Sequence, residues 1–216
     1  HVRSRRQRQM CIRDRITTDY RTSVSPSFFT FDDKKLYALS NRGRDKLSLV
    51  VIDPAKPDAE EEVFTPDTVD LDGAGYSRKR RVLTLAAYQT DKPQFKFFDA
   101  QSEALFKTLS AKLSGYEIAL QGSNRDENKF IVAAYNDRTP GSRYIYDATT
   151  DTLTKLADIN PAIPEADMAH VRPISYQSRD GLTIHGYLTL PAGRDPKNLP
   201  CICLLYTSDA ADDSLR

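Results

Sequence analysis

The sequence predicts a mainly β fold that contains part of a β-propeller, with about three four-stranded blades. Three segments follow one pattern: a strand rich in β-branched and aromatic residues, a polar turn, a second strand ending in Asp, another turn and a short outer strand. The aspartates that end the second strands, Asp53, Asp99 and Asp147, are 46 and 48 residues apart. A period of about 40–50 residues with four short strands per repeat is typical of propellers. The repeats are Lys34–Phe64, Arg80–Leu109 and Asn128–Leu156.

Each repeat supplies two well-defined strands and a weaker candidate for the innermost strand. The first strands are expected at Leu36–Ser40, Val82–Tyr88 and Phe130–Tyr135, and the second at Leu47–Asp53, Gln94–Asp99 and Arg143–Asp147. The innermost strands are expected at Ser27–Phe31, Thr68–Leu71 and Tyr116–Leu120. The stretch Ser102–Leu113 could be helical, but its first half is interpreted as the outer strand of the second blade. The three repeat aspartates are predicted to form turns, because Asp side chains accept hydrogen bonds from nearby backbone N–H groups.

The composition is that of an ordinary globular protein. Of the 216 residues, 39% are hydrophobic and 28% charged, and the net charge is +1. This balance gives no field that would attract nucleic acid or an anionic membrane, and no apolar run is long enough to span a bilayer. The three cysteines, Cys11, Cys201 and Cys203, do not suggest a disulfide scaffold or a CxxC metal site. The compartment, cytoplasmic or periplasmic, is left open.

The two ends of the sequence differ from the rest. Residues 1–15 are strongly basic, and residues 203–216 begin like a strand and then become acidic and small. Both resemble translated sequencing-adapter sequence, so they are expected to be foreign to the fold and to pack against nothing. A basic arm for nucleic acid is the alternative for residues 1–15, but the remaining chain shows no matching basic face.

Beyond the repeats the pattern changes. Residues 16–160 are assigned to propeller blades, and residues 161–173 read as a proline-containing linker. Two alternating apolar strands, Ile174–Gln177 and Leu182–Leu190, then flank Ser178–Gly181, whose Asp-Gly pair is a strong hairpin signal. A buried strand is expected at Cys201–Leu204.

The run SRDGLTIHGYLTLPAG followed by KNLP resembles the start of the hydrolase domain in serine peptidases of the prolyl oligopeptidase family, which includes bacterial dipeptidyl aminopeptidases and acylaminoacyl peptidases. The stretches beginning at Ala86 and Asn136 resemble the last propeller blades of the same group. The resemblance implies that residues 174–202 begin an α/β-hydrolase domain. It also implies a parent protein that cleaves short peptides by Ser-His-Asp acyl transfer, without metal or organic cofactor.

The sequence contains no candidate catalytic, cofactor-binding or metal-binding residue. The nucleophile motif G-x-S-x-G fails at Gly75, Gly122 and Gly141. His170 and His185 are interpreted as a linker residue and an outward-facing strand residue, and Asp58–Glu62 as a solvated outer strand or loop rather than a metal site. Arg143, Tyr144 and Tyr146 fit core or edge packing as well as a propeller surface.

These readings give two hypotheses. The first is a fragment of a serine peptidase, itself inactive, whose parent acts on peptides. The alternative is a non-enzymatic β-propeller binding module. Neither hypothesis includes a nucleic-acid or membrane partner, and neither fixes the oligomeric state or the number of blades.

Overall fold

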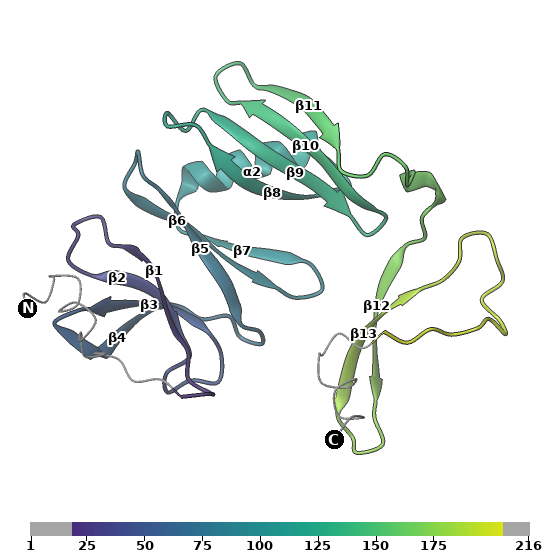
Figure 1. Cartoon of the computed structure of the whole chain (residues 1–216), viewed down its shortest axis with the longest axis horizontal. Coiled ribbons are helices and arrows are strands. Elements are labelled where there is room, and N and C mark those ends of the chain that lie inside the picture. Colours follow the sequence, from purple (N-terminus) through teal and green to yellow (C-terminus); the bar gives the residue numbers. More distant parts are fainter. Residues whose placement is uncertain (1–18, 205–216) are drawn as a thin grey trace, which may run out of the picture. The chain divides into compact units, whose positions relative to one another are not determined.

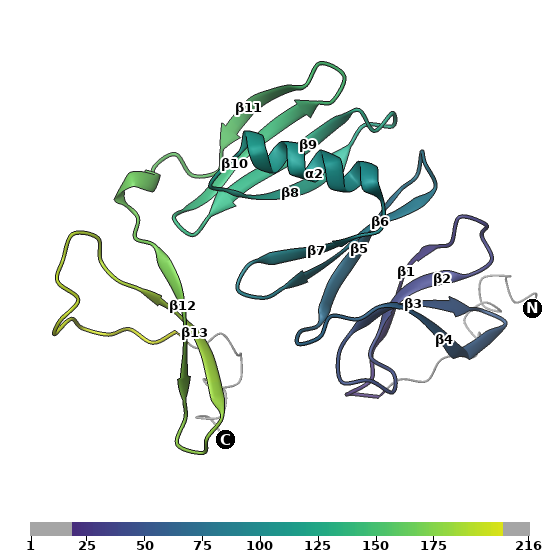
Figure 2. The same ribbon diagram turned by 180° about the vertical axis from the view of Figure 1, so that it is seen from behind.

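A computed structural model describes residues 19–204 of the chain and divides it into two compact units (Figures 1 and 2). The first runs to residue 159, without residues 137–140, and the second comprises residues 137–140 and residues from 160 onward. The fold is mainly β with open sheets, which confirms the predicted fold class. Residues 1–15, predicted to be foreign, lie outside the described residues, as do all but Cys203 and Leu204 of the corresponding C-terminal segment.

The first sheet has four antiparallel strands in chain order: β1 (Val24–Phe29), β2 (Leu36–Ser40), β3 (Ser48–Asp53) and β4 (Lys56–Phe64). Strand β3 is buried on both faces because it is a central strand with apolar side chains pointing to each side. Val50 and Ile52 pack with Ala38 on one face. Leu49 packs on the other face against Leu71 and Ala86 of the next sheet. Because successive side chains of β3 point to opposite faces, this one strand contributes both to the core of its own sheet and to the contact with the middle sheet.

The middle sheet has three strands, β5 (Leu71–Ser77), β6 (Val82–Gln89) and β7 (Pro93–Phe97), followed by helix α2 (Ala100–Lys112). The predicted outer strand within Ser102–Leu113 is therefore wrong. The segment is rich in helix-forming Ala, Leu, Lys and Glu, and the Asp99 side chain caps its N-terminus by accepting a hydrogen bond from the Ser102 N–H. Phe106 of the helix then packs on Phe95 and Phe97 of β7, so the helix covers the sheet where a fourth strand was expected.

The third sheet has four antiparallel strands: β8 (Glu117–Ser123), β9 (Lys129–Asn136), β10 (Thr139–Asp147) and β11 (Thr152–Asp158). Helix α2 lies across this sheet (Figure 2). Gly141 has φ +95°, and a Cβ there would lie 1.9 Å from the Ala134 carbonyl oxygen, so only glycine fits this close approach of β9 and β10. The core between helix and sheet is formed by Leu109, Leu113, Ile118, Val132, Ala134 and Tyr146.

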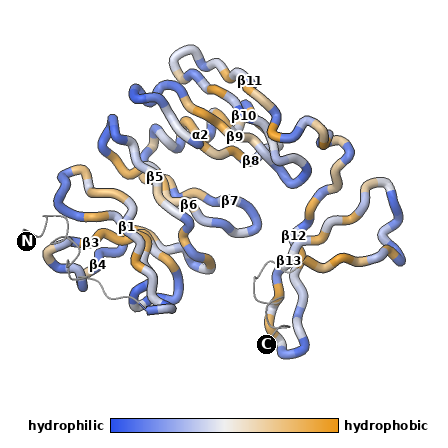
Figure 3. Tube along the Cα trace, in the orientation of Figure 1, coloured by the Kyte–Doolittle hydropathy of each residue, from blue (hydrophilic) through white to orange (hydrophobic). Residues whose placement is uncertain are grey.

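The predicted strand pattern is largely observed, with one displacement in the first unit. Each predicted first and second strand overlaps a strand of the structure, and hydrophilic residues gather at the turns (Figure 3). The predicted innermost strand Thr68–Leu71 is wrong, because β5 begins only at Leu71. Asp70 instead accepts a hydrogen bond from the Leu47 N–H at 2.8 Å, which fixes this segment as the connection between two sheets.

The second unit contains a short 3₁₀ helix, η1 (Glu165–Asp167), and the antiparallel pair β12 (Val171–Gln177) and β13 (Thr183–Thr189). The predicted hairpin is present. Its turn is closed by a hydrogen bond from the Gly181 N–H to the Ser178 carbonyl, with Gly181 at φ +83°. The strand predicted at Cys201–Leu204 is absent: these four residues are exposed and pair with no strand within residues 19–204. Without a neighbouring strand, β-propensity alone does not form a sheet.

Within the part of the chain that the structure describes, no helix is long and apolar enough to cross a membrane.

Candidate functional site

A cleft of the first unit lies between the middle sheet, helix α2 and the third sheet, with a volume of about 780 Å³. Its lining includes the apolar side chains of Leu85 from β6, Leu105 from α2 and Phe130 from β9. The polar part of the lining, called the polar end below, lies where the β5–β6 and β8–β9 turns meet the start of the helix, and it contains the charged side chains Lys79, Arg80 and Glu127.

Glu127, in the β8–β9 turn, is the central group of the polar end. Its carboxylate accepts hydrogen bonds from the Ser77 hydroxyl at 2.5 Å and from the Lys79 backbone N–H at 3.2 Å. Arg80 Nε lies 4.0 Å from the same carboxylate. Glu127 has φ +50°, the left-handed conformation of a tight turn. These contacts tie the third sheet to the middle sheet.

Arg80 makes a second set of contacts with the helix start. Its Nη1 atom lies 2.5 Å from Asp99 Oδ2, and its Nη2 atom donates to the Ser102 hydroxyl at 3.0 Å. The hydrogen bond from Arg80, together with those from the hydroxyl and N–H of Ser102, lowers the pKa of Asp99. Asp99 is therefore held as a charged carboxylate whose acceptor positions are directed at the helix and the arginine.

This arrangement joins the middle sheet to the third sheet and to the start of helix α2. A serine nucleophile needs a base that removes its proton. Ser77 donates to a carboxylate that is already close to an arginine, and no histidine is among the described residues that line the cleft. Tyr146, which also borders it, is a core residue: burial and its hydrogen bond to Asp151 raise its pKa to about 12. Arg143 and Tyr144 are half-buried on the same strand.

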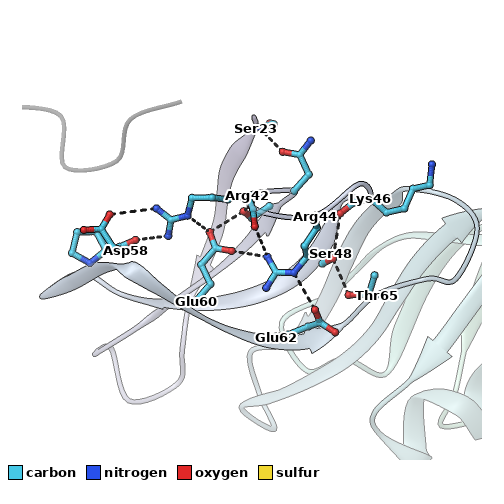
Figure 4. A network of polar contacts seen from close by, with 12 residues as sticks. Ser23, Arg42, Arg44, Lys46, Ser48, Asp58, Glu60, Glu62 and Thr65 are labelled. Carbon is cyan, nitrogen blue, oxygen red and sulfur yellow. Dashed lines mark hydrogen bonds and ion pairs between the residues drawn. The ribbon is translucent and has the colours of Figure 1, made fainter. Parts of the chain in front are cut away.

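A second polar cluster surrounds the acidic strand β4 (Figure 4). Glu60 accepts from Arg44 Nη1 at 2.7 Å and from the Ser40 hydroxyl at 2.8 Å, and lies 3.0 Å from Arg42 Nε. Arg42 also reaches Asp58 at 3.6 Å, and Arg44 reaches Glu62 at 3.0 Å. The carboxylates of this face are thus paired with arginines, and residues 19–204 contain no group of three or more potential metal ligands.

Of the two settings predicted for Asp58–Glu62, the structure shows the outer strand, but the prediction that these side chains are solvated is wrong for Glu60. The Glu60 side chain is only 6% exposed, so it is not solvated. Alternation on β4 directs Glu60 and Glu62 to the arginine face and Glu61 to the other, where it lies 3.3 Å from Lys35. The available sequence signal was the matching alternation of Arg42 and Arg44, four to six residues before β3 begins.

The two described histidines occupy different environments in the second unit. His170 Nδ1 lies 3.0 Å from Asp137 Oδ2, which also accepts from the Val171 N–H at 2.9 Å. The Val171 N–H and then His170 lower the pKa of Asp137. No hydroxyl among residues 19–204 hydrogen-bonds to this pair. His185 is exposed on β13 opposite Ser175.

The three repeat aspartates have two different structural roles. Asp53 and Asp147 each end the third strand of a four-stranded sheet and accept a hydrogen bond from the N–H two residues later, at 2.8 and 2.9 Å. They are turn formers, as predicted. Asp99 occupies the corresponding place in the middle sheet, but it caps a helix and binds Arg80.

Successive antiparallel sheets of three or four strands, with a side-chain contact across each boundary, define the first unit as part of a β-propeller. The packing between the first two sheets includes Phe28 stacked on Tyr76, with ring centroids 4.3 Å apart. The boundary between the second and third includes the Glu127 contacts described above.

Comparisons with known proteins identify what this chain resembles. It is 27% identical over 201 residues to dipeptidyl aminopeptidase BIII of Pseudoxanthomonas mexicana, an alignment that covers 89% of this chain and 29% of that enzyme. The resemblance to prolyl oligopeptidase-family peptidases inferred from the sequence is thereby confirmed. The chain spans less than a third of the length of this relative. No protein-family model matches it.

Solved structures show the same fold. A structure from a study of two prolyl endopeptidases has a TM-score of 0.50 with 16% identity, covering 81% of this chain and 25% of that one. Prolyl oligopeptidase B from Galerina marginata, bound to a 35-residue substrate, also has a TM-score of 0.50, with 14% identity over 76% of this chain and 24% of its own. At these identities the structural matches support the fold and leave function to other evidence.

Proposed function

We propose that this chain is part of a serine peptidase of the prolyl oligopeptidase family. In this proposal the first unit supplies propeller blades, and the β12–β13 hairpin begins the α/β-hydrolase domain. The observation that carries the proposal is the alignment to a dipeptidyl aminopeptidase over 89% of the chain. Because of this coverage, the alignment includes both the sheets and the hairpin, so the match does not depend on a propeller fold alone.

The proposed reaction is peptide cleavage by acyl transfer. A serine hydroxyl attacks the peptide carbonyl, a histidine takes its proton, an aspartate orients the histidine, and backbone donors stabilise the oxyanion. We assign these groups to parts of the full-length protein outside the present sequence. The substrate would be a short peptide, and the blades would limit access to the site. No metal or organic cofactor enters this mechanism.

The 216-residue chain itself is proposed to be inactive. Two observations support this: the Ser77 hydroxyl in the cleft donates to Glu127 near an arginine, and in the second unit no hydroxyl among residues 19–204 hydrogen-bonds to the Asp137–His170 pair. The test is to assay the purified chain with chromogenic dipeptide and acyl-amino-acid substrates and with a fluorophosphonate probe. Stoichiometric labelling, or turnover abolished by mutating one of its serines, would contradict the proposal.

A genetic test distinguishes the peptidase from a binding module. The natural gene is sequenced beyond the codon for Pro200. A peptidase requires a His-Gly-Gly-Pro segment soon afterwards and a later G-x-S-x-G motif, followed by the triad Asp and His. Continuation into further blades without these motifs would instead favour a non-enzymatic propeller.

A further inference from the structure

The segment that leads into β12 contacts the β9–β10 turn. We call this segment, residues 160–171, the strap; residues 137–140 of the turn belong with it to the second unit. The first anchor of the strap is an ion pair between the turn and η1, in which Arg138 Nη2 donates to Glu165 Oε1 at 2.7 Å. Both side chains are partly buried, with 30% and 27% of their surfaces exposed.

The second anchor lies at the end of the strap and uses the neighbouring residue of the turn. Asp137 Oδ2 accepts a hydrogen bond from the Val171 N–H at 2.9 Å and lies 3.0 Å from His170 Nδ1. A carboxylate that accepts from a backbone N–H holds the main chain as well as a side chain. The two anchors therefore fix both the middle and the end of the strap.

Apolar burial contributes little to holding the strap. None of residues 160–171 is buried, and Ile163 and Met168 are 42% and 41% exposed. The half-buried residues of the strap are Glu165, Ala169 and Val171, which lie at the anchors or beside them. A segment with few buried apolar contacts opens locally more easily than a packed strand. The attachment of the strap therefore depends mainly on its polar anchors.

Two prolines reduce the freedom that the strap gains when it detaches. Pro161 and Pro164 fix their φ angles, so the detached segment has fewer conformations available. Weaker contacts then suffice to keep it attached. Because partly exposed ion pairs are individually weak, we expect only a small free-energy difference between the attached and detached forms of the strap.

We infer that the strap is a latch that detaches from the β9–β10 turn as one unit while the third sheet stays folded. The 3₁₀ helix η1 couples the two anchors, because its hydrogen bond from the Met168 N–H to the Glu165 carbonyl connects the residue of the first anchor to the chain that leads to the second. The third sheet has its own core with helix α2 and does not depend on the strap. Since the strap joins the sheets to the β12–β13 hairpin, the latch controls the freedom of this connection. This inference goes beyond the proposed function and does not rest on it.

Hydrogen exchange followed by NMR on the 216-residue chain tests the latch. Arg138→Glu places two carboxylates at the first anchor and leaves the residues of the second anchor unchanged. If the strap detaches as one unit, the protection factors of the Val171 and Met168 amides should both fall at least about tenfold, although Val171 bonds to the unaltered Asp137. The amide of Val132, which is buried in β9, should change by less than about twofold.

Further variants separate loss of the ion pair from damage to the turn. Glu165→Arg disrupts the same pair from the strap and should reproduce the loss of protection at Val171. The double variant Arg138→Glu/Glu165→Arg exchanges the partners of the ion pair, so it should return the protection factor of Val171 to within about threefold of the original value. Asp167→Arg is the matched control, because it reverses a charge of η1 that takes part in neither anchor; it should change protection at Val171 by less than about twofold.

The other outcomes would overturn the inference. Unchanged protection at Val171 in both single variants, whatever happens at Met168, would show that the anchors act independently. An equal loss at Val132 and Val171 in both single variants would show that the strap detaches only when the sheet unfolds. A double variant as unprotected as the single variants would show that the ion pair does not close the latch.

Discussion

Glu60 is the residue whose environment departs most from its sequence context. It lies in an acidic run on the outer strand of a sheet, yet its side chain is 6% exposed and accepts hydrogen bonds or ion pairs from Arg42, Arg44 and Ser40. The hydrogen bond to Glu60 raises the pKa of Arg44 further above its ordinary value, so the arginine stays charged. The cluster connects the β2–β3 turn to β4.

Replacing Glu60→Gln should destabilise the chain. The substitution keeps the size of the side chain but removes the charge between two arginines that are themselves only 23% exposed. Arg42 and Arg44 keep their ion pairs with Asp58 and Glu62 but lose the buried carboxylate that they share, which should lower the free energy of unfolding by about 2 kcal/mol. Urea denaturation followed by circular dichroism measures this change.

Glu61→Gln is the matched control, one residue away on the other face of β4. Its ion pair with Lys35 is solvent-exposed, since the Glu61 side chain is 72% and the Lys35 side chain 44% exposed. The substitution should therefore lower the free energy of unfolding by less than about 0.5 kcal/mol. Equal effects of the two substitutions would mean that the arginine cluster contributes no more than an exposed ion pair.

At the scale of elements, the strand pattern could be predicted because alternation and turn residues are local signals. The hairpin at Ser178–Gly181 and the strands β2, β6 and β9 follow from such signals. Helix α2 was not predicted, because the repeat pattern of the neighbouring blades indicated a fourth strand at this position. That pattern was given more weight than the local composition of the segment. The helix-forming composition of Ala100–Lys112 and a capping Asp99 were both present in the sequence.

Contacts between elements could not be predicted in the same way. Glu127 meets Ser77 across 50 positions of sequence, and Arg80 meets Asp99 across 19. These pairs depend on how turns of different sheets approach each other, which periodicity does not specify. The same holds for the buried state of Glu60, which depends on the register between β3 and β4.

The cap of α2 provides a test at this scale. Asp99→Ala removes the acceptor for the Ser102 N–H and the partner of Arg80, whose side chain is 27% exposed. The free energy of unfolding should fall by about 2 kcal/mol, more than a cap alone, and the helical circular dichroism signal should weaken.

Asp53→Ala is the comparison, because Asp53 accepts one turn hydrogen bond in the corresponding place of the first sheet. The substitution Asp53→Ala should lower the free energy of unfolding by about 0.5–1 kcal/mol. If the two substitutions lower the free energy of unfolding equally, the two aspartates are equivalent turn formers. The contacts of Asp99 with Arg80 and with the helix N-terminus would then add no measurable stability.

At the scale of the whole molecule, the apolar packing is uneven. The first unit has three buried clusters: one within the first sheet, one between the first and middle sheets, and one between α2 and the third sheet. None of the buried hydrophobic residues of the described chain lies in β12 or β13. Stability should therefore differ between the units.

Hydrogen exchange measured by mass spectrometry on the 216-residue chain should reveal this difference. Amides of β3 and β9 lie in central strands with buried side chains, so they should exchange only on larger unfolding of the first unit. Amides paired between β12 and β13 should exchange at least about tenfold faster, because a two-stranded hairpin opens locally at little cost. Strand β2, also central in its sheet, provides a second slow reference. Exchange of the hairpin as slow as that of β3 would show that it is already held by a packed layer within this chain, and the order of stability derived from the buried clusters would be wrong.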